Sequence, residues 1–174
     1  MIKKCLFIAF FLLFGNHLYA KSHQVKRVSS PYLLVDKTEE SSSKNKIITK
    51  AEEYLGKSYG FGNRNDFKTD CSGFTQEIFE QFGLSLPRSA ALQSKHGSRV
   101  DIKDLQVGDL LFYRTYKKEP SHVAIYAGNG QMIHASFRSR QVQYDDIDKS
   151  YYKQRFMYAK RLALVEQDPS IQQN

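Results

Sequence analysis

The spacing of hydrophobic positions changes along this chain, from a helical repeat in its first half to short apolar runs in its second half. One face of a first helix is marked by Ile47, Ile48, Ala51, Tyr54 and Leu55. Ser43 can cap the start of this helix and Gly56 can end it. A loop rich in Gly, Asn and aromatic residues is expected over residues 57–69.

A second helix is predicted from a stripe of apolar residues, Phe74, Ile78, Phe79 and Phe82. Asp70 stands at the capping position, which puts Cys71 in the first turn, and Gly83 ends the helix. A shorter helix is expected from Ser89 to His96, with Ser89 as its cap.

Strands are expected in the second half of the chain. They lie at Asp109 to Tyr113, His122 to Ala127, Gln131 to Ser136, Arg140 to Tyr144 and Phe156 to Leu164, with a helical turn from Ser150 to Gln154. Gly128-Asn129-Gly130 is a tight-turn signal, so the strands on either side of it should form a hairpin. Helices followed by strands predict an α+β fold, with an antiparallel sheet packed against N-terminal helices.

The first twenty residues have the order of a secretory signal peptide. Lys3 and Lys4 precede an apolar run from Leu6 to Phe14, and Ala20 can end a cleavage site. The run is shorter than the ~20 apolar residues of a spanning helix, so cleavage is favoured over a retained anchor. We expect an exported protein, periplasmic or secreted, with a signal peptide at 1–20, a flexible segment at 21–43, one domain at 44–165 and a disordered tail at 166–174.

Composition narrows the class of protein only modestly. The chain has 174 residues, of which 41% are hydrophobic and 25% charged, as in globular domains. Its net charge of +8 stays basic when the two lysines of the signal are removed. A basic protein suits an anionic polymer such as the cell wall, but equally nucleic acid or an acidic membrane. No nucleic-acid motif is visible, so we expect no nucleic-acid partner.

Cysteine usage draws attention to one residue. Cys5 leaves with the signal, so Cys71 is alone in the mature chain and cannot form an intramolecular disulfide. Oxidising compartments usually pair or discard thiols, although a buried, inert Cys is also common. The first turn of a helix favours negative charge, so this position should lower the pKa of Cys71 and make a thiolate nucleophile. Gly73 should leave room for a substrate backbone.

Two histidines complete a catalytic constellation. His122 opens an apolar strand and is the candidate base, while His134 lies in the paired strand and can orient it. The predicted hairpin brings the two rings alongside. A thiol, a base and a group that orients the base are what cysteine catalysis requires. Zinc is the competing interpretation, but structural zinc usually takes four ligands, often close Cys pairs, so we expect neither a metal nor a cofactor.

Five motifs in this order closely resemble the NlpC/p60 family of peptidoglycan peptidases. They are Asp70-Cys71-Ser72-Gly73-Phe74, Leu86-Pro87-Arg88-Ser89, Gly108-Asp109-Leu110-Leu111-Phe112, Ser121-His122-Val123-Ala124-Ile125-Tyr126 and Ile133-His134-Ala135. The likeness covers about residues 46–164. Gln93 and the basic pair Lys160-Arg161 make the chain most similar to the small murein endopeptidases of Gram-negative bacteria.

The resemblance implies a papain-like fold and hydrolysis of an amide in wall stem peptides, either the D-alanyl–diaminopimelate crosslink or the γ-D-glutamyl–diaminopimelate bond. It implies that Cys71 is the nucleophile, His122 the base and His134 the third member. The residues expected to bind substrate are Tyr59, Asp70, Ser72, Arg88 and Ser121, whereas Asp109 should be structural. A monomer without a membrane anchor after cleavage is expected.

The sequence departs from the family pattern in two places. Close Gram-negative relatives often carry a lipid-modified Cys after the signal, but Cys5 precedes the apolar run. Of two adjacent glycines usual after the Tyr, Gly62 is kept and Asn63 replaces the second, which could reshape the groove. Permuted relatives with lipid chemistry place the His before the Cys, unlike this chain. A wall-binding module without catalysis and a secreted wall-degrading effector remain alternatives.

Overall fold

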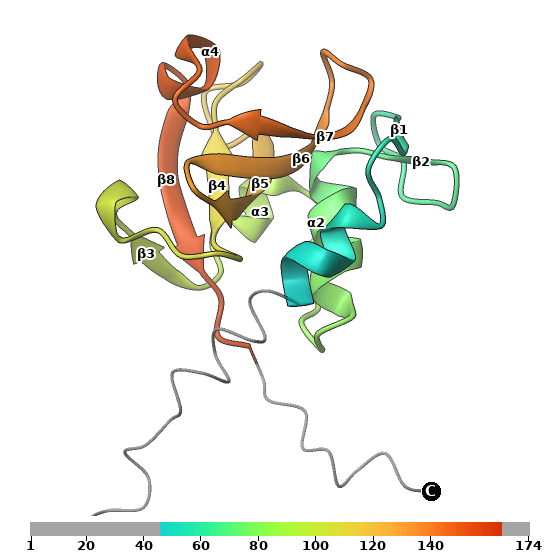
Figure 1. Cartoon of the computed structure of the whole chain (residues 1–174), viewed down its shortest axis with the longest axis horizontal. Helices are drawn as coiled ribbons and strands as arrows, with labels where there is room; N and C mark the ends of the chain where they lie inside the picture. The colour runs from blue at the N-terminus through green and yellow to red at the C-terminus, as the bar shows by residue number, and fades with distance from the viewer. Residues whose placement is uncertain (1–45, 165–174) are drawn as a thin grey trace, which may run out of the picture. The chain divides into compact units, whose positions relative to one another are not determined.

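The structure, a computed structural model, describes residues 46–164, in which a short helix and two very short strands precede the main helix and a broad sheet (Figure 1). The predicted signal peptide, the segment 21–43 and the tail 166–174 lie outside the described residues. After a helical segment over 46–52, the elements are β1 (Ser58–Tyr59), β2 (Lys68–Thr69), α2 (Cys71–Glu80), α3 (Ala90–Gln93), β3 (Ser98–Val100), a 3-10 turn (Ile102–Asp104), β4 (Leu110–Tyr113), β5 (His122–Gly128), β6 (Gln131–Ser136), β7 (Gln141–Asp146), α4 (Ser150–Lys153) and β8 (Phe156–Arg161).

The strands form one sheet in the order β2-β1-β7-β6-β5-β4-β8-β3. The α+β class is therefore confirmed, but the sheet is mixed rather than wholly antiparallel, because β1 and β2 pair in parallel. Strands of two residues carry no hydrophobic periodicity, so this stretch looks like a loop in the sequence. The three-residue strand β3 at the other edge was missed for the same reason.

Both faces of the sheet are covered, because alternate residues of each strand point to opposite sides. The helical segment 46–52 and α2 lie together on one face, as Figure 1 shows. That side of the core contains Ile47, Ala51, Phe74, Ile78, Phe79, Phe112, Val123, Ile125 and Ile133. The opposite face is formed by Leu111, Tyr113, Ala124, Met132, Ala159 and, from α4, Tyr152.

The hairpin predicted around Asn129 is confirmed and sets the register of the two histidine strands. Asn129 and Gly130 both have positive φ, at 51° and 73°, which suits a primed two-residue turn. Ile125 lies opposite Ile133 across the hairpin. Because side chains alternate along each strand, this register puts His122 and His134 on the same face as diagonal neighbours.

Element ends differ from expectation in the first helix. The helix stops at residue 52 and a turn leads to Gly56, whose φ of +80° reverses the chain. Leu55, expected on the buried face, is 46% exposed because it lies in this turn. The helix expected over 89–96 has four residues, with Ser89 as its cap as predicted.

Candidate active site

Asp70 holds the start of α2 and therefore the position of Cys71. Its carboxylate accepts a hydrogen bond from the backbone N–H of Gly73 at 2.8 Å, which is the predicted N-cap. The same carboxylate accepts from the backbone N–H of Gly62 at 2.8 Å and from both terminal nitrogens of Arg88, at 2.8 and 2.9 Å. One buried acid thus ties the preceding loop, the helix and an arginine together beside Cys71.

Gly73 has a packing role rather than the substrate-facing role expected from the sequence. A Cβ at this position would lie 2.9 Å from the backbone oxygen of Asn63 and 3.0 Å from Oγ1 of Thr69. The residue is buried under the loop that precedes the helix. Its missing side chain makes room for that loop, so the expectation that it admits a substrate backbone was wrong.

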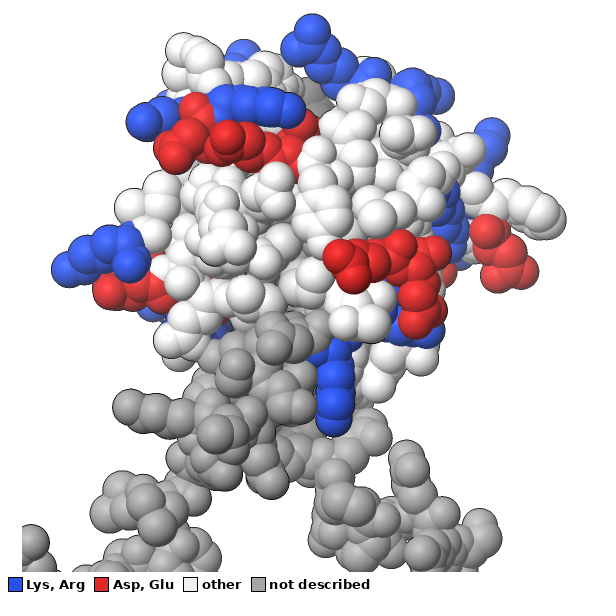
Figure 2. Space-filling view, in the orientation of Figure 1, with Lys and Arg blue, Asp and Glu red and all other residues white. Residues whose placement is uncertain are grey.

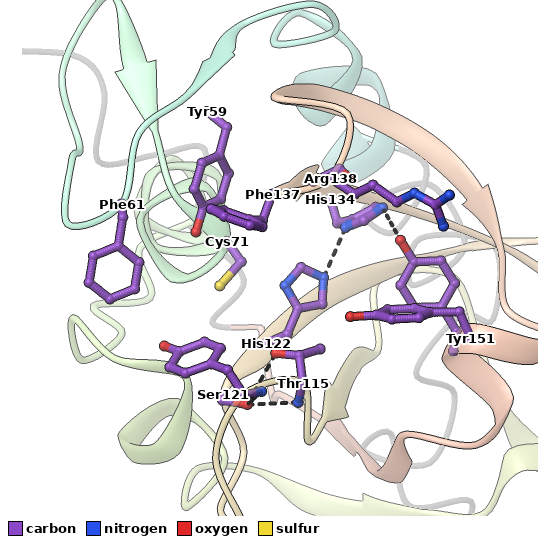
Figure 3. Close-up of a pocket in the computed structure, with 13 residues that line it drawn as sticks. Tyr59, Phe61, Cys71, Thr115, Ser121, His122, His134, Phe137, Arg138 and Tyr151 are labelled. Atoms are coloured by element: carbon purple, nitrogen blue, oxygen red, sulfur yellow. Dashed lines mark hydrogen bonds between the residues drawn. The ribbon is translucent and has the colours of Figure 1, made fainter.

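A chain of hydrogen bonds runs away from Cys71 through the two histidines (Figure 3). Nε2 of His122 lies 2.9 Å from Nδ1 of His134, and Nε2 of His134 lies 2.9 Å from Oδ2 of Asp145. His134 is 1% exposed, and Figure 3 shows the sulfur of Cys71 and the ring of His122 beside the same open space. The structure therefore brings together the three residues that the sequence predicted as catalytic.

The order of donors along this chain follows from Asp145. An ionised carboxylate only accepts, so Nε2 of His134 carries the proton in that bond. Nδ1 of a neutral His134 is then an acceptor, and Nε2–H of His122 donates to it. This arrangement leaves the lone pair on Nδ1 of His122, the nitrogen not engaged by His134. A neutral His122 in this tautomer can accept a proton from a thiol.

Asp145 was missed by the sequence analysis. Its Oδ2 also accepts from Nε2 of Gln143 at 2.8 Å and from the Tyr152 hydroxyl at 2.9 Å, and Oδ1 accepts from Lys149. Although burial raises it, the hydrogen bonds from His134, Lys149, Gln143 and Tyr152 together hold the pKa of Asp145 far below its usual range. An acid on the buried side of an alternating strand was the available signal, but its meaning depends on the register between β6 and β7.

Burial, rather than the helix terminus, dominates the ionisation of the resting site. Burial raises the pKa of the Cys71 thiol to about 11, even though backbone hydrogen bonds from Val123 and Ser72 lower it. Burial and then the neighbouring His134 hold the pKa of His122 well below its usual value near 6.5. These two shifts favour a neutral thiol beside a neutral imidazole, against the thiolate predicted from the helix terminus.

Cys71 lies between two hollows that share five lining residues, Tyr59, Phe61, Cys71, Tyr116 and Ser121. The His122 hollow, of about 460 Å³, is completed by Thr115, His122, His134, Ser136, Phe137, Arg138, Tyr151 and Tyr152. The Arg88 hollow, of about 330 Å³, is completed by Gly62, Asp70, Ser72, Arg88, Ser89, Ala90, Ala91, Lys117, Glu119 and Pro120. The two volumes are in the range of small-molecule and peptide sites.

All five residues predicted to bind substrate line the Arg88 hollow: Tyr59, Asp70, Ser72, Arg88 and Ser121. Figure 3 shows the Tyr59 hydroxyl directed toward Cys71. Burial raises the pKa of Tyr59 far above its usual range, so its hydroxyl is a neutral donor. Ser121 is 4% exposed and accepts from the backbone N–H of Thr115, so it also shapes the loop before His122. Their binding roles remain predictions.

Asn63, which stands where the family pattern has a second glycine, lines neither hollow. Its amide donates to the backbone oxygen of Phe61. Gly62 takes a φ of +74°, whereas Asn63 is not among the described residues with positive φ. Only the first of these two positions needs the freedom of glycine.

Exposed aromatic side chains at the rim of the site were not anticipated from the sequence. Phe61, Tyr116 and Phe137 are 69%, 60% and 65% exposed. The rings of Phe61 and Tyr116 meet edge to face at 6.2 Å, and Phe137 meets Tyr59 at 5.5 Å. Exposed aromatics around a cleft are characteristic of binding surfaces.

Within residues 46–164, no group of three or more His, Cys, Asp or Glu side chains is placed to hold a metal ion. No helix in this part of the chain has the length and hydropathy needed to cross a membrane.

Comparisons with known proteins give matches over most of the described residues. A sequence model of the NlpC/P60 family matches residues 56–161. The chain is 38% identical over 120 residues to the Escherichia coli K12 murein DD-endopeptidase MepS/murein LD-carboxypeptidase, covering 68% of this chain and 63% of that protein. It is 35% identical over 117 residues to the γ-D-glutamyl-L-lysine dipeptidyl-peptidase of Bacillus cereus, covering 66% of this chain and 35% of that protein.

Among solved structures, the crystal structure of an NlpC/P60 family protein from Bacillus cereus matches with a TM-score of 0.65 and 34% identity. The match covers 68% of this chain and 39% of that one. The chain thus spans less than two thirds of the length of these curated relatives.

Proposed function

Because the chain belongs to the NlpC/P60 family, we propose that it is an exported cysteine peptidase that hydrolyses amide bonds in the stem peptides of bacterial peptidoglycan. The observation that carries this proposal is the position of Cys71 and His122 at the meeting point of two hollows. Behind His122, the buried bonds to His134 and Asp145 favour the tautomer that a general base needs. We further propose that it acts as a monomer.

Cys71 is the nucleophile in this proposal and His122 the general base. Nδ1 of His122 takes the thiol proton as sulfur attacks the carbonyl carbon of the amide. This step generates the thiolate only when substrate is present, which suits the raised pKa of Cys71 and the lowered pKa of His122. The imidazolium that forms donates through Nε2 to His134, which is anchored on ionised Asp145.

The oxyanion formed by this attack needs donors close to Cys71. The backbone N–H of Cys71 has no intrahelical acceptor because it lies in the first turn of α2. The neutral hydroxyl of Tyr59 is directed toward the same sulfur (Figure 3). We assign both groups to the oxyanion, because donors fixed in advance stabilise charge that develops in the transition state.

Collapse of the tetrahedral intermediate breaks the C–N bond, and the leaving amine takes the proton from His122. The acyl group stays on sulfur as a thioester. Water then gives a proton to His122 and attacks the thioester, which releases the carboxylic acid and returns the proton to Cys71. No cofactor is needed for this sequence.

We favour the D-alanyl–diaminopimelate crosslink as the bond cleaved. The likeness to an E. coli protein named a murein DD-endopeptidase supports this choice, whereas the likeness to a dipeptidyl-peptidase favours the γ-D-glutamyl bond. The two bonds leave different fragments. Digesting purified sacculi with the mature protein and weighing the released peptides therefore distinguishes them.

The matched control for this digestion is Cys71→Ala, checked by circular dichroism for an unchanged fold. We expect the wild type to release peptides and the variant to release none, because no other thiol is expected in the mature chain. Equal release by Cys71→Ala would contradict the catalytic assignment. Binding to sacculi without release by the wild type would instead favour a wall-binding module.

A further inference from the structure

The His122 hollow contains an arginine that the proposed chemistry does not use. Arg138 is the one lining residue of this hollow, among those described, with a permanent charge. It lies in the loop that joins β6 and β7 and is exposed. Figure 3 shows its side chain on the same side of the hollow as His134 and Tyr151, away from Phe61.

The loop that carries Arg138 is held by its neighbours, so the position of this residue is defined. The Phe137 ring packs edge to face on Tyr59 at 5.5 Å. The guanidinium of Arg140 lies 5.8 Å from the centre of the Tyr59 ring and 5.4 Å from that of Phe137. Two residues of the loop are therefore anchored to the wall of the hollow, and Arg138 lies between them in the sequence.

Arg138 has no acidic partner in the part of the chain that the structure describes. Among residues 46–164, its guanidinium takes part in no hydrogen bond or ion pair, and no Asp or Glu lines the His122 hollow. Asp145, behind His134, is occupied by donors from His134, Gln143, Lys149 and Tyr152. In the Arg88 hollow, by contrast, Arg88 is neutralised by Asp70 at 2.8 Å. An unpaired cation against aromatic walls is suited to an anionic group of the ligand.

The reaction direction shows which part of the substrate enters this hollow. The leaving nitrogen must lie next to His122, because that residue protonates it in the proposed mechanism. His122 and His134 line the His122 hollow and not the Arg88 hollow. The leaving segment therefore enters the His122 hollow, and the acyl segment, which stays on Cys71, lies in the Arg88 hollow.

We propose that the His122 hollow binds the leaving segment of the substrate and that Arg138 recognises a free carboxylate on it. This inference rests on the proposed peptidase function. A guanidinium can bind a carboxylate through two parallel hydrogen bonds, which gives orientation as well as affinity. Both candidate bonds release an amine of diaminopimelate, an amino acid with two carboxyl groups. The substrate class is thus a stem peptide whose leaving residue keeps a carboxylate un-amidated.

The surface charge around the site singles out Arg138. Figure 2 shows basic and acidic side chains next to one another at the end of the molecule that carries α4. Lys149 and Lys153, on and beside α4, form ion pairs with Asp145 and Asp148, which neutralise them. Arg138 has no such pair among the described residues, so it is the cation left to attract an anionic segment.

The test compares two substrates that differ in one group. One is a stem-peptide fragment whose leaving diaminopimelate has a free carboxylate next to the scissile amine, and the other has a primary amide there. We expect the wild type to cleave the carboxylate form with a kcat/KM about tenfold higher, in line with a charge-assisted hydrogen bond at a partly exposed site. Arg138→Gln should lose this preference by slowing only the carboxylate form.

Two control variants separate recognition from general charge. Arg138→Lys keeps the charge without the planar fork, so it should retain part of the preference. Lys118→Gln removes one exposed cation that lines neither hollow, so it should keep the full preference. Equal cleavage of both substrates by the wild type, or an equal loss on both in Arg138→Gln, would overturn the inference and leave the peptidase function standing. Cleavage of neither by the wild type would remove the proposed function and the inference together.

Discussion

At the scale of single residues, burial and hydrogen bonding decide the charge state of the candidate site. Cys71 and His122 are 7% and 8% exposed, and both are held in their neutral forms. Asp145 remains ionised because four side chains donate to it. The negative charge of this chain therefore lies at Asp145, with His122 and His134 between it and the sulfur, and it acts on His122 only through the orientation of His134.

Alkylation of the mature protein by iodoacetamide tests the raised pKa of Cys71. Only the thiolate reacts, so with a pKa of about 11 the rate should rise about tenfold per pH unit between about pH 7 and pH 10. The rate is measured by mass spectrometry of the intact protein, with Cys71→Ala as the unreactive control. A rate that stays constant across this range would mean that a thiolate–imidazolium pair already exists in the free enzyme.

Replacing Asp145 by Asn tests the order of donors. An amide can donate to Nε2 of His134, which would put the proton on Nδ1 and remove the acceptor that His122 needs. We expect kcat to fall about a hundredfold with little change in KM, as for other groups that fix a histidine tautomer.

Gln143→Leu is the matched control for this experiment. It removes a different hydrogen bond to the same oxygen of Asp145 and leaves the histidine chain intact. Its kcat should stay within a few-fold of the wild type. A kcat for Asp145→Asn equal to that of Gln143→Leu would show that Asp145 only stabilises the fold.

At the scale of elements, the start of α2 and the β5–β6 hairpin place the two halves of the site. Asp70 ends the loop and caps the helix, so Cys71 cannot shift without breaking several hydrogen bonds. The hairpin turn at Asn129 and Gly130 sets the register that aligns the histidines. The site therefore depends on how closely the helix packs against the loop and on a short turn.

Gly73→Ala and Gly130→Ala test two different roles of glycine, close packing at the start of α2 and positive φ in the hairpin turn. At Gly73 the new methyl group meets a backbone oxygen at 2.9 Å, so we expect a loss of about 1–3 kcal/mol in the free energy of unfolding and a fall in activity. At Gly130 there is open space but φ is +73°, so the cost should be about 1–2 kcal/mol, with activity retained. Urea unfolding and peptide release measure both quantities. Full activity of Gly73→Ala would contradict close packing at the helix start.

At the scale of the whole molecule, an ion pair with a buried carboxylate joins the last strand, β8, to the residue just before β4. Nε and Nη2 of Arg161, in β8, each lie 2.8 Å from an oxygen of Asp109, just before β4. Asp109 is 1% exposed and also accepts from the backbone N–H of Gln106. These contacts support the structural role predicted for Asp109. Neither Asp109 nor Arg161 lines one of the two hollows.

Arg161→Met should therefore lower stability without changing the chemistry. It leaves a buried carboxylate without its cation, which costs about 3–5 kcal/mol in the free energy of unfolding. Lys160→Met, on the same strand, loses one exposed hydrogen bond to Gly97 and should cost less than about 1 kcal/mol. Urea midpoints measure the difference, and kcat of the folded fraction should match the wild type in both. Similar midpoints for the two variants would contradict a structural ion pair.

Local patterns were sufficient to predict the longer elements and the residues Cys71, His122 and His134 of the candidate site. Some features depend only on neighbours within a few residues, so the sequence is enough to predict them. They are the alternation in β5 and β6, the turn at Gly128-Asn129-Gly130 and the cap at Asp70. Cys71, His122 and His134 were found for the same reason, since each opens or lies within such an element. The short strands β1 and β2 were not found, because they form only by pairing with each other across a loop and, for β1, with the distant strand β7.

The sequence by itself determined the α+β class, the family likeness, and which thiol and imidazoles are available for catalysis. Only the tertiary structure decided that burial raises the pKa of Cys71, that Asp145 accepts a hydrogen bond from His134, that Gly73 accommodates a loop, and that Arg138 lines the His122 hollow. The physical reason is the separation along the chain between the groups that interact. Periodicity and capping depend on contacts a few residues apart, whereas desolvation, strand register and unpaired charge depend on groups brought together from across the chain.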